Sequence, residues 1–486
     1  MENKRFARLA LSAAAAAALA FGCRSVRTAR TTQAALAGNG STNAVDILSR
    51  DIGGNPPEFL FAGTASPDEY VAYALTNRPD IAKAELDVAS AGIAAGIAGA
   101  GRWPQVSGRA GYSRATANRK TGGDWRTEGS WSAGIDLDLM IYDFGKISAQ
   151  ERAAAENLVA AAAALEDAKL AAACEVRTAY FAWLHADAML AVSRTNEMQR
   201  AEHLRQARER FEVGDVRKLD VTQAQLNHSN AGLALIRASN EVATASATLM
   251  KSIGVSAAVT PAPAGIGLGR PAYGMPATSM TAAEAIDFAR TNAPSLALVR
   301  ARFRAASARV DYAIADLYPT LSLGTAFNFS NPDFPATWNW SWAGNLAGSI
   351  FQGFRKTLAV DASVAELMSA AAGLREAEQA LALQVAVAAA DRDTARRAHA
   401  TARLIVRQAR ENLDVVTEEY RVGEASSIDY LDAVASYTQA LGERVEAFYT
   451  EQTAEAKLAR LIGLSPRAAP FAPQGGRGRR GEEKRK

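Results

Sequence analysis

The chain carries the same series of landmarks twice, and this duplication constrains its fold more than any single motif. Asn77 and Pro79 return as Asn292 and Pro294, shifted by 215 residues. A Val-Gly step at Gly214 returns 209 residues later. Because the landmarks keep register outside the middle of each copy, we interpret the chain as two structural repeats joined by a linker.

These landmarks divide the chain into segments with different roles. We expect a signal peptide at 1–22, an N-terminal tail at 23–65, repeat 1 at 66–254, a Pro- and Gly-rich linker at 255–280, repeat 2 at 281–464 and a disordered basic tail at 465–486. The two tails are expected to be irregular and to pack with the linker around the middle of the molecule.

Each repeat changes its hydrophobic period in the same order. Repeat 1 predicts one helix from Pro67 to Arg102, a β-hairpin at 104–141, a long helix at 146–210 and a shorter helix at 219–253. Repeat 2 predicts a helix, a β-hairpin at 319–350, a long helix at 354–420 and a shorter helix at 428–462. Helices dominate this pattern, so the fold class is mainly α with a small β part.

The β segments alternate apolar and polar residues, with tryptophan at Trp131, Trp338, Trp340 and Trp342 on the apolar face. One interpretation buries this face in a sandwich of sheets. The other exposes it to lipid, because transmembrane strands show this alternation together with aromatic girdles. We favour the membrane, since two strands per repeat are too few for an independent sheet and no helix looks long and apolar enough to span a bilayer. Four strands cannot close a barrel, so several chains must share one.

The long helices predict a rod rather than a globular core. About 65 residues at 1.5 Å each would extend roughly 100 Å. We expect the two shorter helices of each repeat to lie end to end beside the long one. Small and apolar residues at alternating spacings of four and three predict coiled-coil seams. The seams are Ala402, Val406, Ala409, Leu413, Val416 and Tyr420 on one helix, and Ile428, Leu431, Ala435, Thr438, Gly442, Val445 and Tyr449 on the next.

A tight turn is predicted where each long helix meets the following one. Gly214 and Gly423 stand just past a helix end, where a left-handed residue is needed. Ser426 and Asp429 then suit the start of the next helix. Each repeat therefore contains a helical hairpin with a tight tip.

The N-terminus has the features of an export signal. Lys4, Arg5 and Arg8 precede an apolar stretch too short to span a bilayer, and small residues lead to Cys23. The stretch before Cys23 is similar to the lipobox of bacterial lipoproteins, which predicts lipidation of this cysteine; a plain cleaved signal is the alternative. The remaining Cys174 is expected to be a small core residue.

The sequence argues against several function classes. A net charge of +3 in 486 residues gives no reason to expect nucleic-acid binding. His185, His203, His228 and His399 lack metal-ligand spacing, so we expect them on helix surfaces and expect no metal or cofactor. No nucleophile elbow or P-loop is present, which disfavours an enzyme. A lipid-anchored periplasmic adaptor or structural coiled coil is the remaining alternative.

Taken together, the landmarks resemble those of the TolC-type outer-membrane efflux proteins, and within them the lipoprotein factors of tripartite pumps. The resemblance covers about residues 66–464. It depends on the order of helix, two strands and two helices, and on three pairs of motifs: Trp103-Pro and Tyr318-Pro, Tyr142-Asp-Phe-Gly and Phe351-Gln-Gly, Phe211-Glu-Val-Gly and Tyr420-Arg-Val-Gly. It implies a homotrimer in the bacterial outer membrane, with a 12-strand β-barrel continued by a 12-helix periplasmic α-barrel.

The resemblance also implies partners and site residues. The family exports passively, with an inner-membrane pump and a periplasmic adaptor that would meet the tips at Val213, Gly214, Val422 and Gly423. Acidic residues and a tyrosine line the family's periplasmic gate; the matching positions here are Asp220, Tyr420, Asp429 and Asp432. Where relatives can carry a basic latch residue this chain has Ala425, so we expect either a weaker latch or one that uses Arg217 or Lys218 instead. Asp220 and Asp429 could instead serve only as helix-start carboxylates.

Overall fold

The computed structural model describes residues 66–118, 125–214, 216–255, 280–331, 337–422 and 424–464. The predicted signal peptide, Cys23, most of the linker, Gly423 and the basic tail lie outside these residues. Within them, the duplicated order of elements is confirmed.

The helices and strands of the two repeats correspond one to one. Repeat 1 contains α3 (Pro67–Asn77), α4 (Pro79–Gly99), the 3-10 turn η2 (Ala100–Arg102), β1 (Gln105–Asn118), β2 (Trp125–Tyr142), α5 (Lys146–Glu212) and α6 (Lys218–Ser252). Repeat 2 contains α7 (Ala282–Asn292), α8 (Pro294–Ala315), β3 (Thr320–Asn331), β4 (Thr337–Ala347), α9 (Arg355–Val422) and α10 (Ser427–Leu461).

The first helix of each repeat is broken in two, so the prediction of one continuous helix from Pro67 to Arg102 is wrong. Arg78 has extended backbone angles, φ −71° and ψ 131°, between α3 and α4. Ala293 breaks the second repeat at the matching position, with φ −67° and ψ 120°. Each break precedes a proline, whose ring disfavours the helical conformation of the residue before it.

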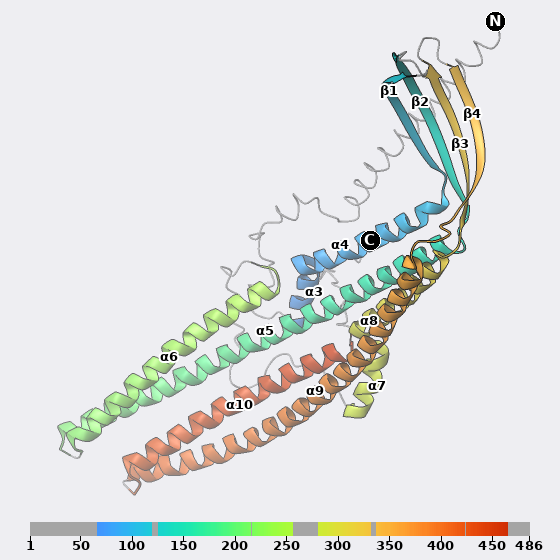
Figure 1. Ribbon diagram of the computed structural model, residues 1–486. Coiled ribbons are helices and arrows are strands. Elements are labelled where there is room, and N and C mark those ends of the chain that lie inside the picture. Colours follow the sequence, from blue (N-terminus) through green and yellow to red (C-terminus); the bar gives the residue numbers. More distant parts are fainter. Residues whose placement is uncertain are drawn as a thin grey trace, which may run out of the picture.

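The molecule is elongated, with the sheet at one end and the helical tips at the other (Figure 1). Helices α4 and α6 both pack on α5, along different parts of its length, and α8 and α10 do the same on α9. The expected arrangement of two shorter helices beside each long one is thus confirmed. Helix α8 also packs on α5, so the two repeats share one helical layer.

Ion pairs reinforce the contact between α5 and α8. Glu156 accepts from Arg304 at 2.8 Å, and Arg152 lies 3.0 Å from Asp311. Closer to the sheet, Asp316 pairs with Lys146. Because α5 and α8 run in opposite directions, the three pairs form a ladder that joins repeat 1 to repeat 2.

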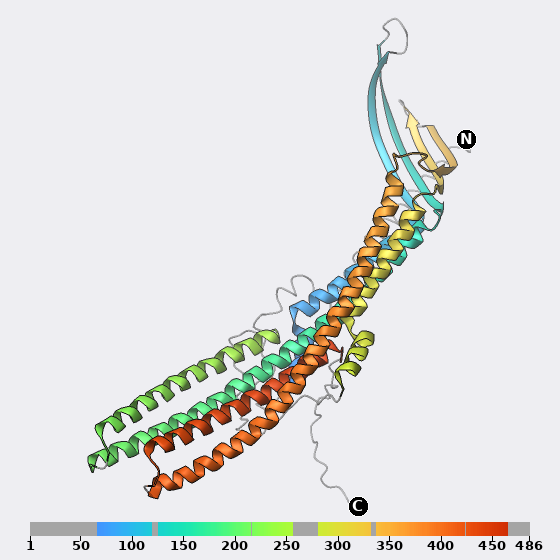
Figure 2. The same cartoon turned by 60° about the horizontal axis from the view of Figure 1, so that its bottom comes forward.

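The four strands form one antiparallel sheet in the order β1-β2-β3-β4. The central pairing of β2 with β3 joins the repeats, with Ile135 opposite Phe327, and the ladder shifts register only between Met140 and Tyr142. Figure 2 shows the strands standing beyond the helical rod. The outer edges of β1 and β4 have no partner strand among the described residues.

A sharp turn connects each hairpin to its long helix. Phe144 and Gly145 have φ values of +53° and +88° before α5, and Phe354 has φ +63° before α9. Positive φ is rare for a bulky residue, so packing must hold it in place. Phe144 stacks on Tyr318 with ring centroids 4.9 Å apart. The Tyr142-Asp-Phe-Gly motif of repeat 1 therefore contacts the Tyr318-Pro motif of repeat 2.

The main core lies where helices of both repeats meet. Its largest fully buried side chains include Tyr180, Phe181 and Leu184 of α5, together with Leu249 and Met250 of α6. Cys174 is also buried, as expected of a small core residue. A smaller cluster joins α7, α9 and the end of α10.

The two predicted seams have different outcomes. Every member of the α9 seam is buried or half-buried, with Ala402 and Val406 buried, so that prediction is confirmed. The α10 seam is partly wrong, because Ile428 and Ala435 are exposed. The residues that α10 buries in this region are Ala433, Val434, Ala440 and Leu441. This helix contacts α5 as well as α9, so its buried face is wider than one seam.

The expectation that no helix is long and apolar enough to span a membrane also needs correction. Helix α9 contains an 18-residue stretch whose mean hydropathy of 1.3 meets that criterion by length and composition. A single such stretch is weak evidence for a span.

Candidate functional site

The apolar face of the sheet is continuous across all four strands. Trp340 stands opposite Phe327 and Trp338 opposite Phe329, while Tyr112 and Trp131 pack with ring centroids 4.7 Å apart. The predicted lipid-facing tryptophans are all exposed: Trp131 by 59%, Trp338 by 61%, Trp340 by 63% and Trp342 by 72%.

The opposite face of the sheet is polar and carries a cross-strand network. Arg109 on β1 donates to Asp136 on β2 at 2.7 Å and to Asn328 on β3 at 2.8 Å. Gly134 lies between them, opposite both Arg109 and Asn328, and its missing side chain leaves room for the arginine to cross. A sheet that is aromatic on one face and charged on the other suits a barrel wall between lipid and an aqueous lumen.

The hairpin tips lie at the other end of the molecule (Figure 1). Val213 is 80% exposed and Val422 is 62% exposed. Gly214 has φ +80°, which confirms its left-handed turn, and nothing lies within 4 Å of the position where a Cβ would be. The tips therefore present small apolar residues that are exposed in this chain.

The predicted gate carboxylates Asp220 and Asp429 both act at helix starts. Asp220 accepts from the Arg217 amide at 3.0 Å, and Asp429 accepts from the Ser426 amide at 3.0 Å. The Ser426 hydroxyl also donates to Asp429, and these bonds lower the pKa of its carboxyl. Both acids therefore cap a helix start in this chain, and their role at the gate of an assembly stays a prediction.

Asp432 differs from these two residues. It lies one turn further into α10, is exposed, and takes no part in the capping bonds. Asp429 and Asp432 lie three residues apart and so share a face of the helix. A gate role for these acids stays a prediction.

Tyr420 is held by a residue that the sequence analysis did not anticipate. Arg210, from the end of α5, donates to the Tyr420 hydroxyl at 3.1 Å and lies 4.7 Å from its ring centroid. Within this chain the cation at Tyr420 is thus Arg210 of α5, while Arg217 lies at the start of α6 beside Asp220. A latch role for Arg217 or Lys218 in an assembly stays a prediction.

His203 is buried, so the expectation that it lies on a helix surface is wrong. It is 7% exposed, and its ring stacks on Tyr430 with centroids 5.9 Å apart. Tyr430 in turn stacks on Tyr420 at 5.1 Å. No periodicity on α5 signals this contact, because it depends on α10 packing across the two hairpins.

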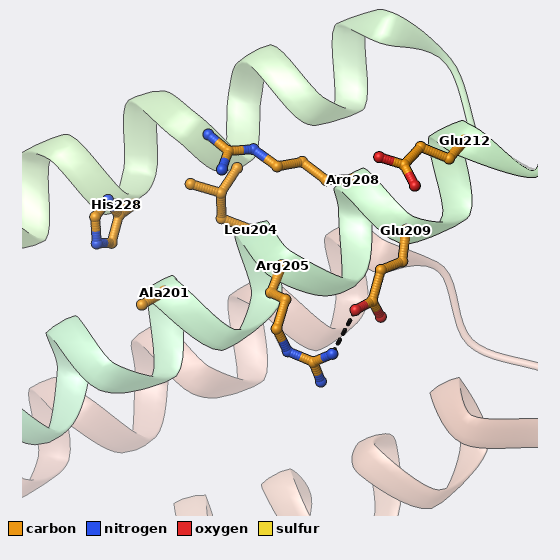
Figure 3. Close-up of a pocket in the computed structure, with 7 residues that line it drawn as sticks. All are labelled: Ala201, Leu204, Arg205, Arg208, Glu209, Glu212 and His228. Atoms are coloured by element: carbon orange, nitrogen blue, oxygen red, sulfur yellow. Dashed lines mark hydrogen bonds and ion pairs between the residues drawn. The ribbon is translucent and has the colours of Figure 1, made fainter.

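A surface pocket of about 320 Å³ lies between α5 and α6 near the first tip (Figure 3). Its charged lining includes Arg205, Arg208, Glu209 and Glu212, and Arg205 pairs with Glu209. The sequence analysis did not single out this pocket; the run of charges before Phe211 was its only signal. Within the described ranges, no group of three or more potential ligands could hold a metal ion.

Comparisons with known proteins agree with this architecture. The family model described as "Outer membrane efflux protein" matches residues 71–255 and 285–464. OprJ of Pseudomonas aeruginosa, an outer membrane protein, is 26% identical over 374 residues, 75% of this chain and 77% of the relative. The outer membrane efflux protein BepC of Brucella suis is 26% identical over 338 residues, 68% and 70% of the two chains.

Solved structures share the fold. The outer-membrane channel OprN superposes with a TM-score of 0.75 at 18% identity, covering 87% of this chain and 96% of its own. The CmeC outer membrane channel of Campylobacter jejuni gives 0.73 at 20% identity, covering 82% and 85%. With the family model spanning both repeats, the conclusion is direct: this chain belongs to the outer membrane efflux protein family, and its place is the bacterial outer membrane with an extension into the periplasm.

Proposed function

We propose that this protein is the exit duct of a tripartite efflux system, and that it conducts substrates passively from an inner-membrane pump across the periplasm and the outer membrane. The observation that carries the proposal is the four-stranded sheet, aromatic on one face and polar on the other, whose two hairpins lead into long helices of 67 and 68 residues. A duct needs a lipid-facing wall and a long aqueous conduit in series. This chain supplies one segment of each.

The assembly is a homotrimer in this proposal. Four strands cannot close a barrel, whereas twelve can, and the free edges of β1 and β4 would pair with neighbouring copies.

Helix α6 also carries an exposed apolar stripe that would suit a neighbouring copy. Leu219, Leu226 and Leu233 of α6 are exposed by 61%, 60% and 47% at seven-residue spacing, as expected of a coiled-coil face that awaits a partner helix.

The partners follow from the two ends of the molecule. A periplasmic adaptor would dock at the tips, where Val213 and Val422 are exposed and where the charged pocket lies between α5 and α6 near the first tip. The adaptor would connect the duct to the inner-membrane pump, which supplies energy and selects substrate. The Trp-bearing face would contact outer-membrane lipid, assisted by a lipid anchor at Cys23.

Two measurements on the purified full-length protein test this proposal. Light scattering in detergent should give a stable trimer, and planar bilayers should show discrete channel conductance. A monodisperse monomer without conductance contradicts the proposal. The Cys23→Ser variant distinguishes a membrane barrel from a lipid-anchored adaptor. A barrel would still need detergent for extraction, whereas an adaptor that has lost its lipid anchor would become soluble in buffer.

A further inference from the structure

Four side chains from three helices form a single column just above the tips. His203 of α5 stacks on Tyr430 of α10, Tyr430 stacks on Tyr420 of α9, and Arg210 of α5 covers Tyr420. The interplanar angle of both ring stacks is 17°. The column begins and ends on α5, so it ties the hairpin of repeat 1 to the hairpin of repeat 2.

The charges around His203 disfavour its protonation. Two cations of α5, Arg200 and Arg210, act on this histidine. The other titratable groups in the column are the phenols of Tyr430 on α10 and Tyr420 on α9. Burial, followed by these two arginines, lowers the pKa of His203. Glu202 is the carboxylate that acts on Tyr430, and it is bound by Arg205.

We propose that His203 and Tyr430 are positioning residues for Tyr420, and that protonation of His203 releases this column and loosens the periplasmic end of the duct. The inference depends on the proposed function as a channel. A proton on His203 would add a third cation to the two that already act on this buried position, Arg200 and Arg210, and unpaired buried charge is costly. Releasing the ring to water removes that cost.

The direction of the pH effect follows from linkage. When the column opens, His203 is hydrated and its pKa returns toward the ordinary value of about 6.5. As the pH falls below that value, the released form binds a proton that the stacked form does not. The stacked form therefore loses stability between pH 6.5 and its own lower pKa, by at most about tenfold in population per pH unit for each chain.

The test is single-channel recording of the full-length protein in planar bilayers, with the periplasmic side taken from about pH 7.5 to about pH 5 so that the interval spans the ordinary histidine pKa. We expect the conductance of the native channel to rise on acidification. His203→Phe keeps a buried stacking ring without a titrating nitrogen, and it should stay at the neutral-pH conductance throughout. His203→Ala removes the ring and should show raised conductance at both pH values.

A matched control is available on the neighbouring helix. His228 of α6 lies 3.0 Å from Glu197, outside the column, and His228→Phe should keep the native acid response. Tyr430→Phe should also keep it, because the stacking ring remains. The inference is overturned if His203→Phe responds to acid like the native channel, if His228→Phe abolishes the response equally, or if a conducting native channel shows no response. Absence of any conductance instead contradicts the proposed function.

Discussion

Ser426 and Asp429 form a reciprocal cap at the start of α10. The Ser426 amide and hydroxyl donate to Asp429 Oδ2 at 3.0 and 2.7 Å, and the Asp429 amide donates back to Ser426 Oγ at 3.2 Å. This cap begins the helix that follows the second tip, so it sets where Tyr430 and Asp432 lie. Any test of Asp429 as a gate residue must separate its charge from this structural role.

The first prediction concerns the stability of that cap. Ser426→Ala should destabilise the protein by about 1 kcal/mol, the usual cost of losing a serine cap. The pKa of Asp429 is lowered, so its contribution is present above its ordinary pKa of 3.8 and is lost as the pH falls through the lower folded value. Denaturant unfolding of the detergent-solubilised protein checks both statements. Ser436→Ala, at an exposed position within α10, is the control and should not destabilise.

The second prediction separates the two faces of the sheet with adjacent residues. Trp340→Arg puts a charge on the lipid face and should cost about 2–4 kcal/mol if Trp340 lies near the bilayer midplane. Asn339→Arg puts the same charge on the polar face, where water solvates it, and should assemble normally. Heat-resistant trimer on unboiled gels and membrane yield are the measurements. Equal losses from both substitutions contradict the assignment of the faces.

The third prediction concerns the first tip. Gly214→Val forces a β-branched side chain to φ +80°, at a strain of about 1–3 kcal/mol, and reshapes the surface offered to an adaptor. Site-specific cross-linking to the adaptor should therefore decrease while the trimer persists. Gly232→Val is the matched control, since Gly232 lies within α6 and also has open space around it. Unchanged cross-linking by Gly214→Val would remove the tip from the docking surface.

The sequence predicts the elements of this fold well because local physics determines them. The proline after each break, the glycine at each tip and the alternation of each strand act within a few residues. The same local rule applies at Pro79, where it accounts for the break between α3 and α4 that the prediction of one continuous helix overlooks. The duplication alone does not predict that β2 pairs with β3, because this pairing depends on the two repeats lying side by side.

The candidate site was less predictable because it depends on contacts between distant helices. Arg210 and Tyr420 are separated by 210 positions, and no spacing rule connects them. The sequence predicts a surface position for His203, since single polar residues on Ala-rich helices usually face water. Its burial arises from α10 packing across α5, a tertiary contact that no pattern on α5 encodes.

The last prediction concerns charge at the periplasmic gate. Asp432 is exposed on the same face of α10 as Asp429 and makes none of the capping bonds, so its carboxylate can be removed without disturbing the helix start. In a trimer these two positions contribute six carboxylates around one entrance, and like charges so placed favour cations over anions. Asp432→Asn should therefore reduce cation selectivity and weaken block by multivalent cations in single-channel recordings. Asp429→Asn should add to this effect, while its amide oxygen keeps an acceptor for the Ser426 amide. Asp414→Asn is the control, because Asp414 is an exposed acid on α9 beside Arg410. If Asp432→Asn changes neither selectivity nor block, Asp432 is an ordinary surface acid and the selective constriction lies elsewhere along the duct.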